Sequence, residues 1–136
     1  MKDITLDLDA RNGDLARIAA ALARHHVTLK AGAAVSSGPR VVARFIPSDL
    51  DGARRALDSA NVRFHESDIV PVTLEARPGE LVGLITRLAS GGVGVKALYL
   101  TSAADGRLEL AVAPTNVARA LRALELHVPG VRGVAT

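Results

Sequence analysis

Residues 13–31 read GDLARIAAALARHHVTLKA, and residues 79–97 read GELVGLITRLASGGVGVKA. A shift of 66 residues superimposes the first stretch on the second without a gap. Apolar positions can coincide by chance, but glycine, acidic and lysine positions coincide here as well: Gly13 with Gly79, Asp14 with Glu80, Lys30 with Lys96, and Ala31 with Ala97. The match indicates an internal repeat.

The repeat continues beyond these stretches with one inserted residue. A shift of 67 carries Arg40 onto Arg107 and Pro47 onto Pro114, so the insertion falls in a turn, where insertions are easiest. We therefore expect two tandem domains, residues 1–68 and residues 69–136. A unit of this length is marginally stable alone, so the two are expected to share an interface.

Each copy begins with a predicted strand and a predicted helix. Apolar and polar residues alternate over residues 4–8 and 72–76, as in a half-buried strand. Apolar residues then recur at helical spacing on one face: Leu15, Ile18, Ala19 and Leu22 in the first copy, and Leu81, Leu84, Ile85 and Leu88 in the second. The second of these helices is expected to begin at Pro78 and to end at Gly91-Gly92.

A hairpin, a helix and a last strand complete each copy. The hairpins are predicted over residues 27–46 and 93–112, with turns at residues 36–39 and 104–106. A second helix follows Pro47 or Pro114, and the spacing of Ser48 and Asp51 is that of a capping box. The last strands are predicted at residues 62–65 and 131–135.

The fold class predicted from this order is α+β, with two tandem ferredoxin-like βαββαβ units. Right-handed crossovers give the strand order 4-1-3-2, with both helices on one face of the sheet. The second strand of each copy then lies at an edge, and exposed apolar edges promote aggregation. We expect the two edges to pair with each other and form one eight-stranded antiparallel sheet.

Composition excludes several classes of protein. The chain has no cysteine, which rules out disulfides and thiolate metal sites. Its net charge is only +3, without the concentrated basic face of a nucleic-acid binder. The N-terminus alternates directly into a strand, and no apolar run has the length of a membrane span, so we expect a cytoplasmic protein that binds neither nucleic acid nor membrane.

The sequence resembles tandem ACT-domain proteins. The resemblance lies in Arg77-Pro78-Gly79-Glu80-Leu81, in residues 88–95 (LASGGVGV), in Ala97-Leu98-Tyr99, and in residues 66–70 at the junction of the copies. It covers essentially the whole chain. The resemblance implies a regulatory domain that binds a small effector, commonly an amino acid, between paired domains.

The resemblance also implies where the effector binds, because the first-helix turn of one ACT domain faces the edge strand of the other. One implied site combines Asn12, Gly13, Asp14 and Leu15 with Val95, Lys96 and Ala97. The other combines Pro78, Gly79, Glu80 and Leu81 with Leu29, Lys30 and Ala31. The sequence departs from the family pattern at three positions. Asn12 stands where the family has proline, and Thr28 and Gly94 stand where the family usually has Asn or Asp.

The residue types in these turns suit a polar ligand on physical grounds too. Glycine lets the backbone approach a ligand closely, and a helix start offers unpaired N–H groups to a carboxylate. Asp14 or Glu80 could bind a ligand ammonium instead. The alternative is that Gly13 and Gly79 only form the strand-to-helix turn and that the acids complement the helix dipole.

Enzymatic activity has little support, and we expect no catalytic residue, metal or cofactor. His25 and His26 are neighbours at a helix end and do not share a helix face, so a capping or surface role is expected. His65 and His127 lack a carboxylate partner at metal-binding spacing. RNA-binding proteins of this fold stack bases on aromatic residues of the central strands, and only 2% of this chain is aromatic.

Two functions remain. The first is a sensor of a small molecule, in particular an amino acid, that acts through association as a homodimer or through a regulated protein partner. The second is a dimerisation or protein-interaction scaffold of the same fold that has no ligand.

Overall fold

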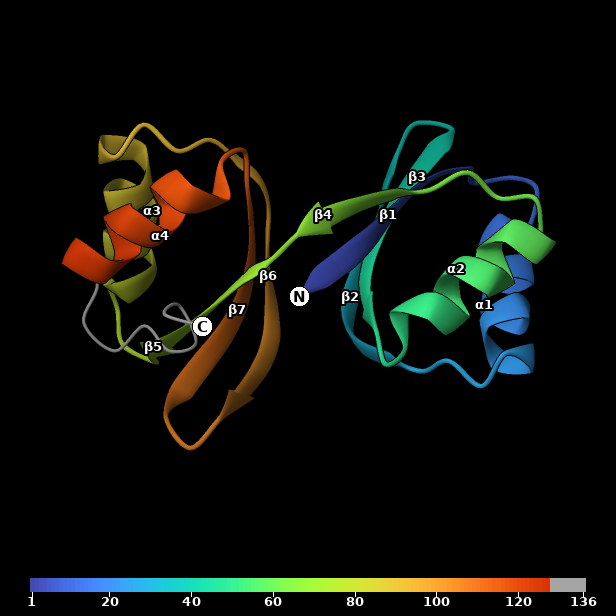
Figure 1. Ribbon diagram of the computed structural model, residues 1–136, viewed down its shortest axis with the longest axis horizontal. Helices are drawn as coiled ribbons and strands as arrows, with labels where there is room; N and C mark the ends of the chain where they lie inside the picture. The colour runs from blue at the N-terminus through green and yellow to red at the C-terminus, as the bar shows by residue number, and fades with distance from the viewer. Residues whose placement is uncertain (128–136) are drawn as a thin grey trace. The chain divides into compact units, whose positions relative to one another are not determined.

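The structure is a computed structural model that describes residues 1–127. The chain folds into two compact units, one over Lys2–Ser67 and the other from Asp68 onward together with Met1. Each unit is α+β, and in each two helices cover one face of an antiparallel sheet (Figure 1). No helix within residues 1–127 is long and apolar enough to cross a membrane.

The N-terminal unit has the predicted βαββαβ order. Its elements are β1 (Lys2–Asp9), α1 (Asp14–Arg24), β2 (Leu29–Ser37), β3 (Arg40–Pro47), α2 (Leu50–Ser59) and β4 (His65–Asp68). The sheet order is β2-β3-β1-β4, so the predicted order 4-1-3-2 is confirmed and β2 lies at an edge of its sheet.

The C-terminal unit repeats this arrangement as far as it is described. Its elements are β5 (Val70–Glu75), α3 (Glu80–Ser90), β6 (Val95–Ala104), β7 (Arg107–Pro114) and α4 (Val117–His127), with sheet order β5-β7-β6. The last strand expected at residues 131–135 lies outside the described residues. The pairing of β2 with β6 into one continuous sheet stays a prediction.

Side chains that alternate along the central strands form a separate core in each unit. In β1, Ile4, Leu6 and Leu8 are buried, and they pair with the buried Phe45, Ala43 and Val41 of β3. Leu57 of α2 and Leu124 of α4, which correspond in the repeat, are both fully buried.

The first helix of each copy buries a narrower face than the sequence predicts. The core receives Ile18, Ala21 and Leu22 from α1, whereas Leu15 is 44% exposed. In α3 the buried residues are Leu84 and Leu88, and Leu81 and Ile85 are 43% and 44% exposed. Leu15 of α1 and the residues Leu81 and Ile85 of α3 are therefore only partly covered by their own units.

Two predicted element boundaries are wrong. Helix α3 begins at Glu80 rather than Pro78, because Gly79 takes a left-handed φ of 90° that a helix cannot contain. The last strand of the first copy spans His65–Asp68 rather than residues 62–65. The amide of Val62 instead donates to the Leu57 carbonyl and closes helix α2.

The predicted capping box at Ser48 is also wrong. The residue before α2 is Asp49, and no side chain caps that helix. The Ser48 hydroxyl instead accepts a hydrogen bond from the Thr28 amide at 3.0 Å, and the Ser48 amide donates to the Thr28 carbonyl at 2.8 Å. Thr115 holds Gly94 in the same way, at 3.1 Å and 2.8 Å. This hydroxyl clamp fixes the start of each edge strand to the turn before the second helix.

A bidentate ion pair joins α2 to β4. Arg54 donates from Nε and Nη2 to the two carboxylate oxygens of Glu66, each at 2.7 Å. Hydrogen bonding to Arg54 is the main reason why the pKa of Glu66 lies below its ordinary value.

We predict that Leu57→Ala and Leu124→Ala each lower the free energy of unfolding by about 2–5 kcal/mol, because each leaves a cavity in a closed core. Urea denaturation measures the effect. Val82→Ala is the control, because Val82 is 68% exposed and should change stability by less than about 0.5 kcal/mol. A small effect of Leu57→Ala would show that the N-terminal unit does not pack as described.

The Arg54–Glu66 pair predicts a pH dependence. A carboxyl whose pKa is lower in the folded state stabilises the fold above its unfolded pKa, and this contribution disappears as the pH falls through the folded pKa. Glu66→Gln should therefore destabilise the protein at neutral pH, and its difference from the wild type should shrink as the pH falls below about 4. Asp58→Asn, an exposed acid, is the control. A difference that does not change with pH would contradict the ion pair.

Candidate functional site

The turns that precede α1 and α3 are open on the side of their glycine residues. Gly13 and Gly79 precede α1 and α3 with left-handed φ values of 66° and 90°, and no side chain caps either helix. A Cβ atom added at either glycine would find no atom within 4 Å. Glycine is therefore needed here for its backbone conformation, and the space in front of each turn is open within its unit.

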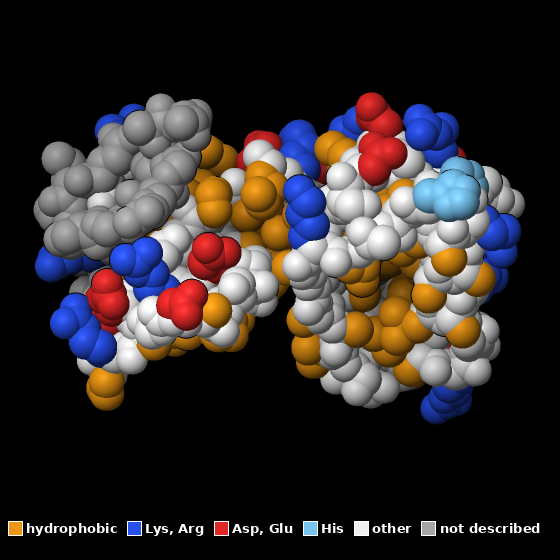
Figure 2. Space-filling view, turned by 90° about the horizontal axis from the view of Figure 1, so that it is seen from below, with side chains coloured by type: hydrophobic (Ala, Val, Ile, Leu, Met, Phe, Trp, Pro, Cys, Tyr) orange, Lys and Arg blue, Asp and Glu red, His pale blue; other side chains and the backbone are white. Residues whose placement is uncertain are grey.

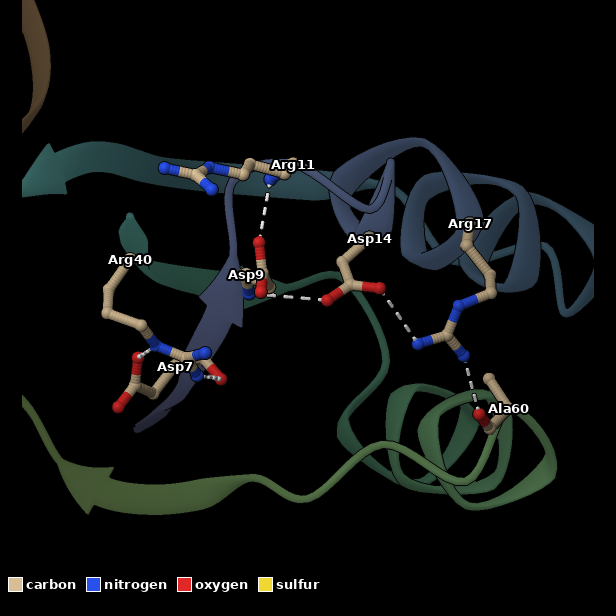
Figure 3. A network of polar contacts seen from close by, with 7 residues as sticks. All are labelled: Asp7, Asp9, Arg11, Asp14, Arg17, Arg40 and Ala60. Carbon is tan, nitrogen blue, oxygen red and sulfur yellow. Dashed lines mark hydrogen bonds and ion pairs between the residues drawn. The ribbon is translucent and has the colours of Figure 1, made fainter. Parts of the chain in front are cut away.

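The acidic residues of the turns are already bound to arginines. Asp14 accepts hydrogen bonds from the Asp9 amide and from Arg17, both at 3.3 Å, and Arg17 continues to the Ala60 carbonyl at 2.7 Å (Figure 3). Glu80 pairs with Arg77 at 2.7 Å. A ligand ammonium would have to compete with these arginines.

A neighbouring pair lies on the adjacent strands of the same unit, where Arg40 binds the carboxylate and the carbonyl of Asp7, both at 3.1 Å (Figure 3). Arg17, Arg40 and Arg77 each hold an acid of their own unit. These three are structural ion pairs of an exposed surface.

Each edge strand begins with a β-bulge at its lysine. In β2, Leu29 pairs with Pro47 and Ala31 with Ile46, which leaves Lys30 as the extra residue. In β6 the pairs are Val95 with Pro114 and Ala97 with Ala113, which leaves Lys96. Bulges at sheet edges redirect side chains, so both lysines depart from the regular alternation of their strands.

None of the fourteen predicted ligand-binding residues is buried, and in the N-terminal unit Asn12 and Gly13 lie apart from the edge-strand residues 29–31. The turn at Asn12 and Gly13 follows β1 beside the hairpin end of the sheet, where the Ala10 amide donates to the Pro39 carbonyl. Leu29 pairs with Pro47 at the opposite end. The implied sites combine residues of both units, so they stay predictions.

The structure does bring four of the predicted residues together, in a combination that the sequence did not predict. Leu15, Leu29, Lys30 and Ala31 line a groove of about 390 Å³ between α1 and β2, here called the α1–β2 groove. Figure 2 shows hydrophobic side chains in a hollow of this unit. Asn12, Gly13 and Asp14 do not line the groove.

Of the two histidines at the end of α1, His25 contacts the helix end with its side chain. His25 follows the helix, and its Nδ1 lies 3.0 Å from the Ala21 carbonyl. His26 has a left-handed φ of 56°, and Gly92 has a φ of 72° at the corresponding position. Among residues 1–124, whose side chains the structure describes, no three or more His, Asp or Glu residues form a cluster that could bind a metal.

No model of a known protein family matches the sequence, and no curated protein matches it. The fold, however, is similar to several solved structures. For protein BT0572 from Bacteroides thetaiotaomicron the TM-score is 0.81 at 23% identity, over 92% of this chain and 86% of that one. For the ligand-free regulatory subunit of aspartate kinase from Thermus thermophilus it is 0.67 at 19% identity, over 93% and 91%.

The regulatory subunit of aspartate kinase from Thermus flavus gives a TM-score of 0.62 at 18% identity, over 93% of this chain and 91% of that one. At these identities the likeness establishes the fold. The predicted resemblance to tandem ACT-domain proteins is therefore confirmed at the level of the fold.

We predict opposite effects on stability when two glycines of the C-terminal unit are replaced by alanine. Gly79→Ala should destabilise the protein by about 1 kcal/mol, because its backbone is left-handed. Gly83→Ala should stabilise it by up to about 1 kcal/mol, because Gly83 lies in α3 with open space around it. Thermal unfolding of both variants checks this, and Gly13→Ala should behave like Gly79→Ala. Equal effects at Gly79 and Gly83 would contradict the described turn.

Proposed function

We propose that this chain, which has the fold of a tandem ACT-domain protein, is a regulatory module that binds a small effector, in particular an amino acid. The copies are residues 1–68 and 69–136. The turn of one copy and the edge strand of the other form each site, Asn12–Leu15 with Val95–Ala97, and Pro78–Leu81 with Leu29–Ala31. Occupancy is transmitted by association as a homodimer or by contact with a protein partner, without a catalytic step.

The observation that carries this proposal is the duplicated open turn. A left-handed glycine opens α1 and α3 alike, and neither helix start has a side-chain cap. The first N–H groups of a helix have no partner within the helix, and together with the helix dipole they favour an anion. The α-carboxylate of an amino acid fits such a turn.

The solved structures of similar fold support a regulatory role. Two of them are regulatory subunits of aspartate kinase, and they match over nearly the whole length of both chains. We carry over to this chain the regulatory role alone, without the enzyme that those subunits regulate.

A scaffold without a ligand is the second candidate, and specific contacts favour it. Asp14 and Glu80 are occupied by Arg17 and Arg77. The amides at Thr28 and Gly94 already donate to the hydroxyl clamp. Large apolar side chains also stand exposed on both edge strands, namely Leu29, Val35, Val95 and Leu100.

Thermal unfolding against the common amino acids separates the two candidates. A ligand present at about 100 times its dissociation constant stabilises the folded state by about 2.7 kcal/mol, which raises the midpoint by a few degrees. We expect one amino acid or a few related ones to produce such a shift. No shift across a millimolar panel would reject the sensor and leave the scaffold.

The lysines of the two bulges provide a second test. Lys30→Met with Lys96→Met should weaken binding of the amino acid that gave the shift, because both lysines lie at the proposed sites. Arg63→Met with Arg122→Met is the matched control, because it removes two exposed charges elsewhere. Unchanged affinity in the lysine variant would remove these residues from the site.

A further inference from the structure

The α1–β2 groove is a cavity formed by the N-terminal unit alone. Ile18, Ala19 and Leu22 of α1 contribute to one side, and β2 and β3 contribute to the other. Its volume of about 390 Å³ lies within the range of small-molecule sites. Along α1 the lining extends from Leu15 to Leu22, about 10 Å at the rise of an α-helix.

Strand register explains why the groove exists. Gly32 and Ala34 of β2 pair with Phe45 and Ala43, which face the helices and are buried. Gly32 and Ala34 therefore lie on the helix-facing side of β2. Neither residue has a side chain large enough to reach α1.

The second copy carries larger residues at the corresponding positions. With the shift of 66 residues, Gly32 corresponds to Leu98, Ala34 to Leu100 and Ala19 to Ile85. Leu98 pairs with Val112 and packs against the core of its unit. The space that Leu98 helps to fill in the second copy is open in the first.

The charged groups around the groove define the ligand that it suits. Arg44 is held by Asp3 through two hydrogen bonds, of 2.9 Å and 3.1 Å. Lys30 lies in the lining at the bulge and makes no hydrogen bond or ion pair with the described residues. The lining includes no acidic residue among those that the structure describes. A carboxylate is thus attracted by Lys30, whereas an ammonium finds no anionic partner.

We propose that the α1–β2 groove binds an aliphatic carboxylate that lacks an α-ammonium group. The alkyl chain lies along α1 over Gly32 and Ala34, and the carboxylate lies near Lys30. This site differs from the effector sites proposed above, because it uses one copy only and excludes the amino acid zwitterion. Leu29, Lys30 and Ala31 belong to both proposed sites, so octanoate binding and amino acid binding are measured separately, and either proposal can fail without the other.

Isothermal titration of the full chain with octanoate, 1-octanol and octylamine tests the ligand class. Octanoate should bind most tightly and octylamine most weakly. Lys30→Met should weaken octanoate about threefold to fivefold and leave 1-octanol unchanged, as expected for an exposed charge pair. Equal affinity for octanoate and octylamine, or an unchanged affinity for octanoate in Lys30→Met, would overturn the carboxylate assignment.

Residues of the second copy can be placed in the first copy to test whether octanoate binds in the α1–β2 groove. Ala19→Ile with Ala34→Leu places in the first copy the residues that the second copy carries, and it should lower octanoate affinity at least about tenfold by occlusion. Ala20→Ile with Val35→Leu is the matched control, because neither residue lines the groove. If the double variant unfolds early, Ala19→Ile alone replaces it. Unchanged affinity in a folded, groove-filled variant would overturn the site.

A second copy of the chain is the competing occupant. Light scattering of the groove-filled variant distinguishes the two. Dissociation of a wild-type dimer on filling the groove, without octanoate binding to the wild type, would overturn the proposal and identify the groove as an interface. An unchanged association state together with lost octanoate binding would support it.

Discussion

The two helices of the N-terminal unit leave one edge of its four-stranded sheet largely uncovered, and this limit underlies several features of the chain. In the N-terminal unit α1 and α2 bury the central pair β1 and β3, while β2 remains largely exposed at its edge. An apolar side chain on the helix-facing side of an edge strand is stabilised when the strand's own unit, a ligand or another chain covers it. The two copies meet this constraint with different residues on β2 and β6.

The two copies share backbone features at positions where their residues differ. At the end of the first helix, His26 and Gly92 take the same left-handed conformation, although histidine adopts it less readily than glycine. Ser48 and Thr115 form the same hydroxyl clamp to Thr28 and Gly94. The clamp uses the amides at the positions where the chain departs from the ACT pattern.

The sequence predicted the element order, the strand order and the core strands, because these depend on the spacing of apolar residues and on an internal repeat that the sequence shows directly. It failed where a distant partner decides the outcome. The hydroxyl of Ser48 has a helix nearby to cap, but Thr28, far away along the chain, binds it instead. Leu15 and Ala19 have the spacing of a core face, yet only the position of β2 shows that they border a groove. One position beyond the aligned stretch, the first copy has Gly32 where the second copy has Leu98. This difference indicates a groove only when the strand register shows that the position points toward the helices.

The groove and the proposed effector turn have one residue in common, and this has a thermodynamic consequence. Leu15 lies in the first turn of α1, directly after the helix-opening Gly13 and Asp14, and also lines the groove. A ligand that fixes Leu15 against β2 restricts the turn that the effector must contact. Coupling of this kind is reciprocal, so each ligand must change the affinity of the other by the same factor. The groove also contains Leu29, Lys30 and Ala31, which belong to the other proposed effector site, so a groove ligand should be coupled to both effector sites.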